Sequence, residues 1–397
     1  MARMAEPHRI LIIRPSALGD VCRSVPVLTT LRRAFPEATI DWLVQDSFAP
    51  AIATHRDLDG VIPFPRRHFA AWWRRPSIAL ELLTWLRDLR ARRYDLVIDA
   101  QGLGRSGVFA YLSGAPRRIG HAHAREGAWL AYTDRVAGRQ HPHTVDEMMT
   151  LLEPLDITPM LDLRLDLDPD AEAWWDAERR STGYADRPYT VFAPTARWAS
   201  KRWPIDRWVK LRDRLHDERD ELVVIIGAPG EEDQVAPLRA DIRPGRSIID
   251  LVGHTSIPQT MAVIGQARAV VANDSAPLHM AVGFERPCIG LFGPTDERRV
   301  GPYGRIDSVV RAVPLRDGRA VNFKSAEPGV SMMSAITVEQ VAGALRRECA
   351  RAEGGALNES ADSRPELDAP CPPNRSGSPA HPRVVAFCWR KRGSVSR

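Results

Sequence analysis

Short apolar runs alternate with helical patterns along this chain, and the alternation starts twice. In the first half, apolar runs typical of strands lie at 9–14, 39–44, 60–64 and 95–99. In the second half they lie at 189–193, 221–226, 247–251, 269–272 and 287–292. Strands buried on both faces of a parallel sheet have such continuous apolar sequences, and a helix connects one strand to the next. The sequence therefore predicts an α/β fold with two parallel sheets in separate domains.

The two series also set the expected domain boundaries, since 397 residues are too many for one ordinary core. The expected parts are a first domain at 7–160, a linker at 161–187, a second domain at 188–350 and a disordered tail at 351–397. The tail is rich in Pro, Ser, Gly and charged residues, which is typical of disorder. Among the helices, we predict one at 21–35, a short one around 170–181, and a last one at 337–350 that packs back toward the first domain.

Composition excludes several classes of protein. No apolar run approaches the ~20 residues that a membrane-spanning helix needs, and the N-terminus lacks the apolar region of a signal peptide. The five cysteines form no C-x-x-C pair, so neither a disulfide framework nor a zinc site is expected. These features predict a cytoplasmic protein.

The basic residues are nearly all arginine, and the net charge is +5. Four arginines surround two tryptophans in one short segment, which contains Arg66, Arg67, Trp72, Trp73, Arg74 and Arg75. Such a segment suits a membrane surface or an anionic acceptor. No nucleic-acid-binding motif accompanies it, so a nucleic-acid partner is not expected.

Residues suited to binding gather in the loops that follow the predicted strands. These loops lie at 14–20, 100–105, 194–203, 227–231, 273–277 and 293–297. Ligands of parallel α/β sheets bind at the carboxyl ends of the strands, so the loops predict a site in a cleft between the domains. The chain has no G-x-G-x-x-G fingerprint and no P-loop, which disfavours a dinucleotide oxidoreductase or an NTPase.

Three of these loops carry side chains with plausible chemistry. Asp20 lies where the first strand becomes a helix, and it suits either a stabilising first-turn acid or a general base. Lys201, one of four lysines, precedes a helix start and suits a phosphate. Asp274 and Ser275 also begin a helix, where N–H groups can hold a diphosphate and the carboxylate can accept hydrogen bonds from a sugar. His279 in that helix is expected to be a packed, supporting residue.

Seven segments together resemble the heptosyltransferases of glycosyltransferase family 9, which build the inner core of lipopolysaccharide. They are RPSALGD at 14–20, IDAQGLGRS at 98–106, AREGAWLAY at 124–132, KRWP at 201–204, GAPGEE at 227–232, NDSAPLHMAVGFERP at 273–287 and FGPTD at 292–296. The resemblance covers roughly residues 9 to 345, and the second and third segments look most like the enzyme that adds the first heptose to a Kdo residue. It implies a GT-B fold, with two Rossmann-like domains facing across a cleft. It also implies an ADP-heptose donor, inversion at the anomeric carbon, and no metal or other cofactor.

The resemblance also implies roles for single residues. Asp20 matches the catalytic base, Lys201 the contact to the donor phosphates, and Asp274 the acid that binds the donor sugar. The other residues assigned to the donor are Thr195, Gly227, Glu231, Ser275 and His279. The basic contacts to the acceptor are Arg66, Arg67, Arg105 and Arg125. The expected partners are thus a nucleotide-diphosphate sugar and an anionic glycolipid, with peripheral contact at the cytoplasmic face of the inner membrane.

Other functions are compatible with the same residues. One is a GT-B transferase that uses another nucleotide sugar and another glycan acceptor, and a GT-B epimerase is a variant of it. A different class is a catalytically inactive member that binds a nucleotide or glycan. The presence of Asp20, Lys201 and Asp274 favours an active transferase.

Overall fold

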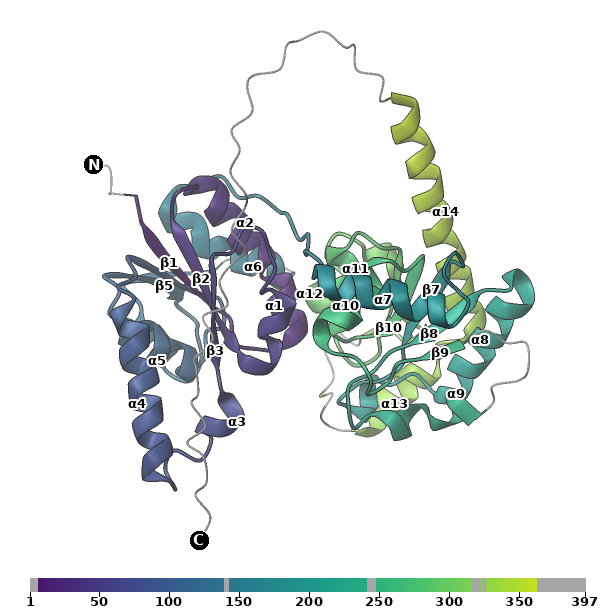
Figure 1. Ribbon diagram of the computed structural model, residues 1–397, viewed down its shortest axis with the longest axis horizontal. Coiled ribbons are helices and arrows are strands. Elements are labelled where there is room, and N and C mark those ends of the chain that lie inside the picture. The colour runs from purple at the N-terminus through teal and green to yellow at the C-terminus, as the bar shows by residue number, and fades with distance from the viewer. Residues whose placement is uncertain are drawn as a thin grey trace.

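The computed structural model describes residues 6–138, 143–240, 248–315, 322, 324 and 326–362, and these residues form two α/β domains (Figure 1). The first sheet has the order β3-β2-β1-β4-β5-β6, and the second has the order β12-β11-β10-β7-β8-β9. The first sheet consists of β1 (Arg9–Ile13), β2 (Thr39–Gln45), β3 (Gly60–Phe64), β4 (Leu96–Asp99), β5 (Arg117–His121) and β6 (Asp134–Val136). The second consists of β7 (Tyr189–Ala193), β8 (Leu222–Ile225), β9 (Ile248–Asp250), β10 (Ala269–Asn273), β11 (Cys288–Leu291) and β12 (Val309–Val310). All ten strand pairs among the described residues are parallel, which confirms the predicted two-domain α/β fold.

Helices cover both faces of each sheet, so the side chains of a strand alternate between two apolar clusters. In β1, Leu11 and Ile13 pack into the cluster under α4 and α5, whereas Ile10 and Ile12 pack into the cluster under α1 and α2. The helices of the first domain are α1 (Leu18–Arg23), α2 (Val25–Ala34), α3 (Arg66–Phe69), α4 (Pro76–Ala91), α5 (Gly104–Leu112) and α6 (Thr144–Met149). This burial on both faces is the reason that the strands are continuous apolar runs.

The first helix differs from the prediction, because the expected helix at 21–35 is two helices. Helix α1 ends at Arg23, and α2 starts at Val25 with Pro26 in its first turn. Proline has no N–H to donate and its ring clashes with the preceding turn, so one continuous helix cannot pass through this position. At the break between the two helices, the Ser24 hydroxyl donates to the Asp20 carbonyl at 2.7 Å.

The second domain contains most of the remaining helices. They are α7 (Pro169–Ser181), α8 (Ile205–Arg219), α9 (Ala236–Ala240), α10 (Ile257–Gly265), α11 (Ala276–Gly283), α12 (Glu297–Val300), α13 (Ala326–Ser334) and α14 (Val338–Asp362). The short helix predicted in the linker is α7, whose buried Trp175 donates to the Tyr189 hydroxyl of β7 at 2.7 Å. No helix within the described parts of the chain is long and apolar enough to cross a bilayer.

Helix α14 corrects two expectations about the C-terminal part. It continues to Asp362, past the predicted helix end at 350, and it contacts α8 and β11 of the second domain rather than the first domain. Ion pairs of Arg351 with Glu348 at 2.7 Å and of Arg268 with Glu353 at 3.4 Å support the extra turns. The rest of the predicted disordered tail, from 363 onward, lies outside the described residues.

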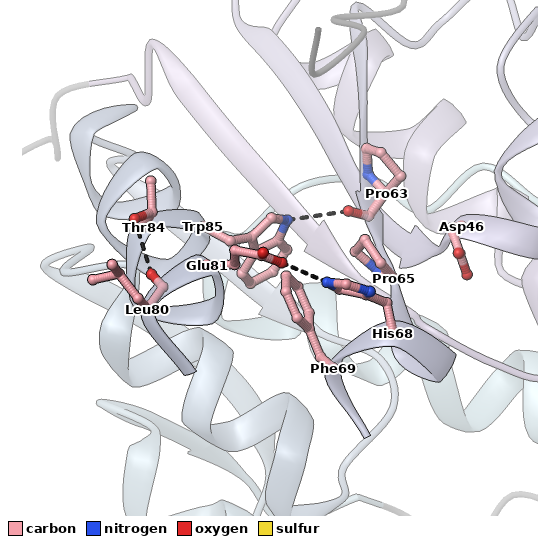
Figure 2. A pocket seen from close by; sticks show the side chains of 9 residues that line it. All are labelled: Asp46, Pro63, Pro65, His68, Phe69, Leu80, Glu81, Thr84 and Trp85. Carbon is pink, nitrogen blue, oxygen red and sulfur yellow. Dashed lines mark hydrogen bonds and ion pairs between the residues drawn. The ribbon is translucent and has the colours of Figure 1, made fainter. Parts of the chain in front are cut away.

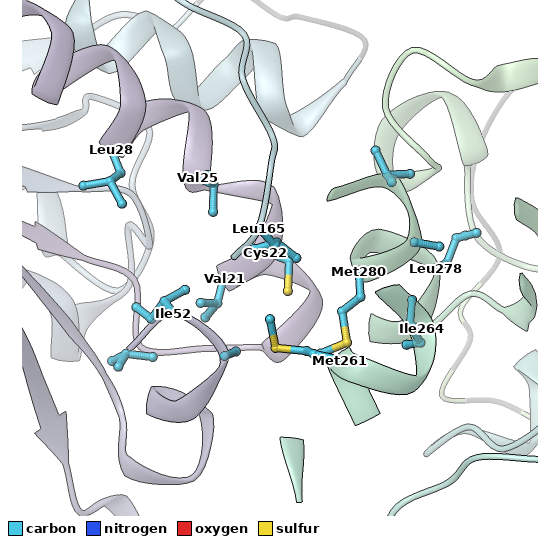
Figure 3. Packing of buried hydrophobic residues seen from close by; sticks show 14 of the residues in the cluster. Val21, Cys22, Val25, Leu28, Ile52, Leu165, Met261, Ile264, Leu278 and Met280 are labelled. Carbon is cyan, nitrogen blue, oxygen red and sulfur yellow. The ribbon is translucent and has the colours of Figure 1, made fainter. Parts of the chain in front are cut away.

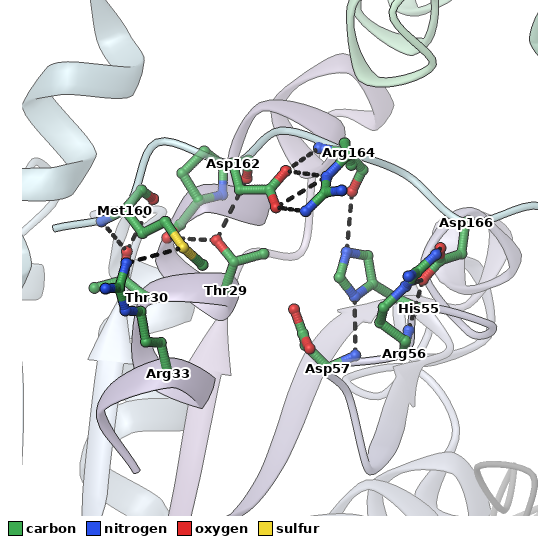
Figure 4. A network of polar contacts seen from close by, with 11 residues as sticks. Thr29, Thr30, Arg33, His55, Arg56, Asp57, Met160, Asp162, Arg164 and Asp166 are labelled. Atoms are coloured by element: carbon green, nitrogen blue, oxygen red, sulfur yellow. Dashed lines mark hydrogen bonds and ion pairs between the residues drawn. The ribbon is translucent and has the colours of Figure 1, made fainter. Parts of the chain in front are cut away.

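The linker is attached to the first domain by polar contacts before it reaches α7 (Figure 4). The Thr30 hydroxyl donates to the Met160 carbonyl at 3.0 Å, and the side chain of Arg56 pairs with Asp166. Asp162 pairs with Arg164 at 2.6 Å. Asp168 then caps α7 by accepting from the N–H groups of Asp170 and Ala171 at 2.9 and 3.1 Å.

An apolar cluster joins the two domains where α1 packs against α11 (Figure 3). Val21 and Cys22 of the first domain belong to the same buried cluster as Met261 and Met280 of the second. Glycine at position 19 permits this approach, since a Cβ there would lie 2.8 Å from His279 Cδ2 and 3.4 Å from Ala276 Cα. The apolar contact therefore depends on the absence of one side chain.

A polar contact joins the domains at a second place. His143 Nε2 lies 3.1 Å from the Gly301 carbonyl, and the Tyr303 hydroxyl donates to Asp146 at 2.5 Å. Arg299 pairs with Glu147 at 3.0 Å. The two attachments together set how the carboxyl edges of the two sheets face each other.

The contact at Gly19 predicts the effect of Gly19→Ala. The added methyl group would overpack the interface, so we expect the free energy of unfolding to fall by about 1–3 kcal/mol in urea titrations. The matched control is Gly354→Ala on α14, where a Cβ meets nothing within 4 Å. That control should be as stable as the parent or slightly more stable, since alanine favours helix. Equal stability of Gly19→Ala and the parent would show that the interface is not tightly packed.

Candidate active site

Asp20 lies in the first turn of α1, directly after the carboxyl end of β1. Its carboxylate accepts from the Ala17 N–H at 3.2 Å and pairs with Arg14 at 3.2 Å. Arg23, one turn further along α1, pairs with its other oxygen. The Asp20 side chain remains 27% exposed, whereas the two arginines are almost fully buried. Asp20 therefore serves as the predicted first-turn acid and also presents a carboxylate at the surface of the site.

The two arginines determine the charge state of this carboxylate. Burial opposes ionisation of Asp20, but Arg14 and then Arg23 outweigh burial and lower the pKa of Asp20 to about 2. The group is therefore ionised at neutral pH, and in the free protein it is a weak base.

A second loop is held against the first. The Ser16 N–H donates to the Gln101 side chain at 3.1 Å, and the Arg14 guanidinium donates to the Ala100 carbonyl. Buried Asp99 accepts from the N–H groups of Gln101 and Gly102 at 2.9 and 3.1 Å and from the Tyr132 hydroxyl at 2.7 Å. These bonds keep the loop after β4 rigid beside Asp20.

The arginines predicted to bind an acceptor are exposed, and they lie around this loop. The Arg125 N–H donates to the Gly102 carbonyl at 2.9 Å. The Arg105 guanidinium lies 5.8 Å from the centroid of the Phe64 ring, and burial, followed by the charge of Arg66, lowers the pKa of Arg105. Arg67 follows Arg66 in α3. Arg105 thus lies at the end of β3, where α3 begins, and Arg125 lies on the neighbouring loop.

On the second domain, Lys201 and Asp274 form a close ion pair. Lys201 Nζ lies 2.6 Å from Asp274 Oδ2, and the Thr295 hydroxyl donates to the same oxygen at 2.7 Å. The three side chains come from the loops after β7, β10 and β11, which meet because these strands are neighbours in the sheet. The Asp274 side chain is only 8% exposed, so the pair is largely shielded from solvent.

A cavity of about 250 Å³ lies beside this pair. Four residues that were predicted to bind the sugar donor line it: Thr195, Gly227, Glu231 and Ser275. Its apolar wall is formed by Ile226, Pro229, Ile257, Pro277 and Met280, together with Leu18 from the first domain. A Cβ at position 227 would lie 2.9 Å from Val252 and 3.0 Å from Thr195, so the wall is close to the backbone of Gly227. Glu231 accepts from the Ala228 N–H at 2.9 Å and thereby shapes the loop. An apolar wall with a few polar groups is typical of small-molecule sites.

His279 is buried between the two halves of the site. Burial, followed by the charge of Arg23, lowers the pKa of His279 to about 3, while Asp274 and Asp20 both act in the opposite direction. The imidazole is therefore neutral at neutral pH, and it lies in the contact between α1 and α11, against Gly19. Its burial agrees with the expected packed position.

Sequence reasoning missed several residues of this arrangement. Arg14 and Arg23 were not assigned a role, although Arg14 is in the RPSALGD segment and Arg23 lies one helical turn after Asp20. Thr295 follows a strand in the FGPTD segment, which was a usable signal. Buried Asn273 accepts from the Trp203 N–H at 3.2 Å and donates to the Pro194 carbonyl at 2.6 Å, and it connects two site loops.

Comparisons with known proteins place the chain among sugar transferases. The family described as "Glycosyltransferase family 9 (heptosyltransferase)" matches residues 83–328. Lipopolysaccharide heptosyltransferase 1 of Pseudomonas aeruginosa is 30% identical over 305 residues, which cover 75% of this chain and 82% of that protein. Lipopolysaccharide heptosyltransferase 3 of Escherichia coli K12 is 28% identical over 288 residues, which cover 70% and 80%. The solved structure of E. coli heptosyltransferase WaaC with ADP-2-deoxy-2-fluoro heptose superposes with a TM-score of 0.67 at 26% identity, over 85% of this chain and 99% of that one.

Buried His279 predicts a pH dependence of stability. Its pKa is about 3 in the folded protein and about 6.5 in an unfolded chain. Between these values only the unfolded chain binds the proton, so the free energy of unfolding falls as pH falls, by about 1.4 kcal/mol per pH unit well below 6.5.

His279→Gln should remove this contribution in urea titrations at about pH 7.5, 6 and 5. The matched control, exposed His254→Gln, should keep the slope of the parent. An unchanged slope in His279→Gln would mean that this imidazole is not held neutral.

Proposed function

The chain belongs to glycosyltransferase family 9, and from this membership we propose that it transfers a heptose from ADP-heptose to a Kdo-containing acceptor of the lipopolysaccharide inner core. We further propose that the transfer inverts the anomeric carbon and needs no metal ion. Relatives that add different heptoses match the chain, so the acceptor is part of the proposal. The observation that carries it is the packing of α1, which contains Asp20, against α11, which begins just after Asp274 of the Lys201–Asp274 pair.

The cavity of the second domain suits the nucleotide of the donor. Its apolar wall is available for the base, and Thr195 and Ser275 are placed for the diphosphate at the N-terminus of α11. Lys201 adds a positive charge beside them. Both contacts to Asp274 use Oδ2, so we assign Oδ1 to a hydroxyl of the sugar.

Asp20 suits the base of an inverting transfer. The acceptor oxygen forms a bond to the anomeric carbon, ADP leaves with the electrons of the old bond, and the acceptor proton passes to the carboxylate. A carboxylate with a pKa of about 2 takes a proton poorly from a neutral hydroxyl. The proton therefore moves late, when bond formation has made the acceptor oxygen acidic. Arg14 and Arg23 hold the carboxylate in place for that step.

The exposed arginines suit an anionic acceptor. Kdo carries a carboxylate, and lipid A carries phosphates. Arginine binds both groups in a bidentate manner. Arg105 lies at the end of β3, beside the start of α3 at Arg66, and Arg125 lies on the loop bonded to Gly102, next to the Asp20 loop. An acceptor held there would present its hydroxyl to Asp20.

Many transferases hold a divalent ion with the carboxylate pair of a D-x-D sequence, and in this chain such sequences lie at 57–59 and within 162–170. The positions of these carboxylates support metal independence. Asp59 pairs with Arg32, Asp162 with Arg164 and Asp166 with Arg56, while Asp168 caps α7. These carboxylates are thus engaged by arginines or by backbone, in the linker and the loop before β3. In this proposal, Lys201, Thr195 and the N–H groups at the start of α11 stabilise the negative charge that develops on ADP.

The first test measures the release of ADP by the parent with each substrate, and then by Asp20→Asn. Release of ADP should require both ADP-heptose and a Kdo-bearing lipid A, and Asp20→Asn should lower kcat by roughly 10²–10⁴-fold. Donor affinity measured by calorimetry should change little. The matched control is Asp168→Asn, which alters a helix-capping carboxylate outside the site and should keep kcat.

Three results would contradict this assignment. Turnover only with another nucleotide sugar would support the alternative transferase, and binding of ADP-heptose without turnover would support an inactive member. Parent-like kcat in Asp20→Asn would refute the base, and loss of its folded circular dichroism spectrum would assign Asp20 to helix stabilisation alone.

The second test concerns the leaving group. Lys201→Ala should lower kcat by about 10²–10³-fold, because one well-placed donor at a developing charge contributes about 2.7–4 kcal/mol. Exposed Lys210→Ala on α8 is the matched control and should keep kcat. EDTA should leave the activity of the parent nearly unchanged.

Activity that disappears with EDTA and returns with Mg²⁺ or Mn²⁺ would refute metal independence. Among the described residues, His121, His123 and Glu147 place potential ligand atoms within 4.8 Å of one another, and none of them lines the donor cavity. His123→Ala would then show whether the required ion binds at this cluster or in the active site.

A further inference from the structure

The segment between α3 and α4 exposes large apolar side chains beside arginines. Trp72 and Trp73 are 53% and 64% exposed, and Leu80 and Leu83 on α4 are 66% and 62% exposed. The Arg74 guanidinium lies 4.3 Å from the centroid of the Trp73 ring. We call this region the α3–α4 surface, and it consists of Arg66, Arg67, Trp72, Trp73, Arg74, Arg75, Leu80 and Leu83. Apolar patches of this kind on a folded protein mark an interaction surface.

A groove of about 650 Å³ lies next to this surface (Figure 2). Pro63, Pro65, Phe69, Leu80 and Trp85 form most of its apolar lining, and the His68–Glu81 pair adds a polar edge. Trp85 donates to the Pro63 carbonyl at 3.1 Å and packs against Phe64 and Phe69. The groove is therefore built on a fixed aromatic cluster, and Leu80 belongs to both the groove and the exposed surface.

The α3–α4 surface is positively charged, which favours an anionic partner. Residues 65–80 contain four arginines and no aspartate or glutamate. All four arginines are exposed. A surface with this charge and two exposed tryptophans matches the head-group region of an anionic bilayer, where tryptophan is favoured and each arginine is attracted by acidic lipids.

The surface lies on the same side of the first domain as the active site. Helix α3 follows the carboxyl end of β3, which is the sheet edge that also carries Asp20 and the loop after β4. The Arg105 guanidinium lies 5.8 Å from the centroid of the Phe64 ring, at the end of β3 where α3 begins, so the surface is continuous with the arginines assigned to the acceptor.

We propose that the α3–α4 surface docks on an anionic lipid bilayer, with Trp72 and Trp73 in the interface and Arg74 and Arg75 against acidic head groups. This inference rests on the proposed function, because docking brings the cleft to a lipid-linked acceptor. Arg66 and Arg67 remain acceptor contacts at the boundary between membrane and cleft.

The test is flotation of the full chain with vesicles that contain neither donor nor acceptor. The protein should bind vesicles of phosphatidylethanolamine and phosphatidylglycerol, bind phosphatidylcholine vesicles at least tenfold more weakly, and dissociate at high salt. Trp72→Ala/Trp73→Ala and Arg74→Ala/Arg75→Ala should each lower the partition coefficient by roughly tenfold or more. The matched control replaces exposed residues of the second domain, Ile306→Ala/Arg347→Ala, and should bind like the parent.

The outcomes separate docking from catalysis. With a deacylated, water-soluble acceptor the two variants should keep the parent kcat/KM, and with the acceptor embedded in vesicles they should lose roughly tenfold. Vesicle binding needs no turnover, so failure of heptosyl transfer would leave the docking result standing. Parent-like binding by both variants, or equal binding to neutral vesicles, would overturn the proposal. Binding only to vesicles that contain the acceptor would replace it with an acyl-chain site, and no vesicle binding would indicate a protein partner.

Discussion

The packing of α1 against α11 is the contact on which the rest of the site depends. It joins the inner apolar faces of two separate sheets into one buried cluster, and it brings together Asp20 on α1 and Asp274 at the start of α11. The charged groups at this contact are paired, Arg14 and Arg23 with Asp20 and Lys201 with Asp274. Burial of Val21, Cys22 and Met280 stabilises the contact, and glycine at position 19 permits the close approach. Because the imidazole of His279 is neutral, the interface adds no further positive charge.

Arginine and lysine side chains supply the positive charge of the site, and each carboxylate of the site pairs with them. Asp20 is kept ionised by two arginines, at the expense of basicity, so the proposed transfer relies on position and on late proton transfer rather than on a strong base. Asp274 is held by Lys201 and Thr295 through one oxygen, which fixes the direction of the other. Acidic residues that resemble a metal-binding pattern instead pair with arginines: Asp166 attaches the linker to Arg56 of the first domain, and Asp162 pairs with Arg164 within the linker (Figure 4). Fixed side-chain charges need no ion to be bound before catalysis, but they require the domain contact to be correctly formed.

The sequence was informative where structure follows from local pattern, and less informative where it follows from tertiary contact. Continuous apolar runs predicted the strands because both sheets are covered on both faces, and parallel topology then placed all the marked loops at the carboxyl edges. The break in the first helix was readable from Pro26, although the apolar spacing hid it. The pairing of Arg23 with Asp20, the contact of Thr295 with Asp274 and the groove beside Leu80 depend on packing between distant segments. The roles assigned to single donor and acceptor residues came from the family resemblance, and they stay predictions.

Parallel topology also explains why recognition of the acceptor and attachment to a membrane can share one side of the first domain. Every strand of its sheet ends at the same edge, so α3, the loop after β4 and Asp20 are neighbours there without a special insertion. A lipid-linked acceptor is confined to a plane, and a protein free in solution meets it at a low effective concentration. An exposed pair of tryptophans with four arginines is costly in a protein that only binds small molecules from water, since it promotes non-specific association. It becomes useful when the second substrate is in a membrane, because docking orients the cleft before the acceptor arrives. The second domain, which shows no comparable cluster of exposed tryptophan among its described residues, is then left to bind a water-soluble donor from the opposite side of the cleft.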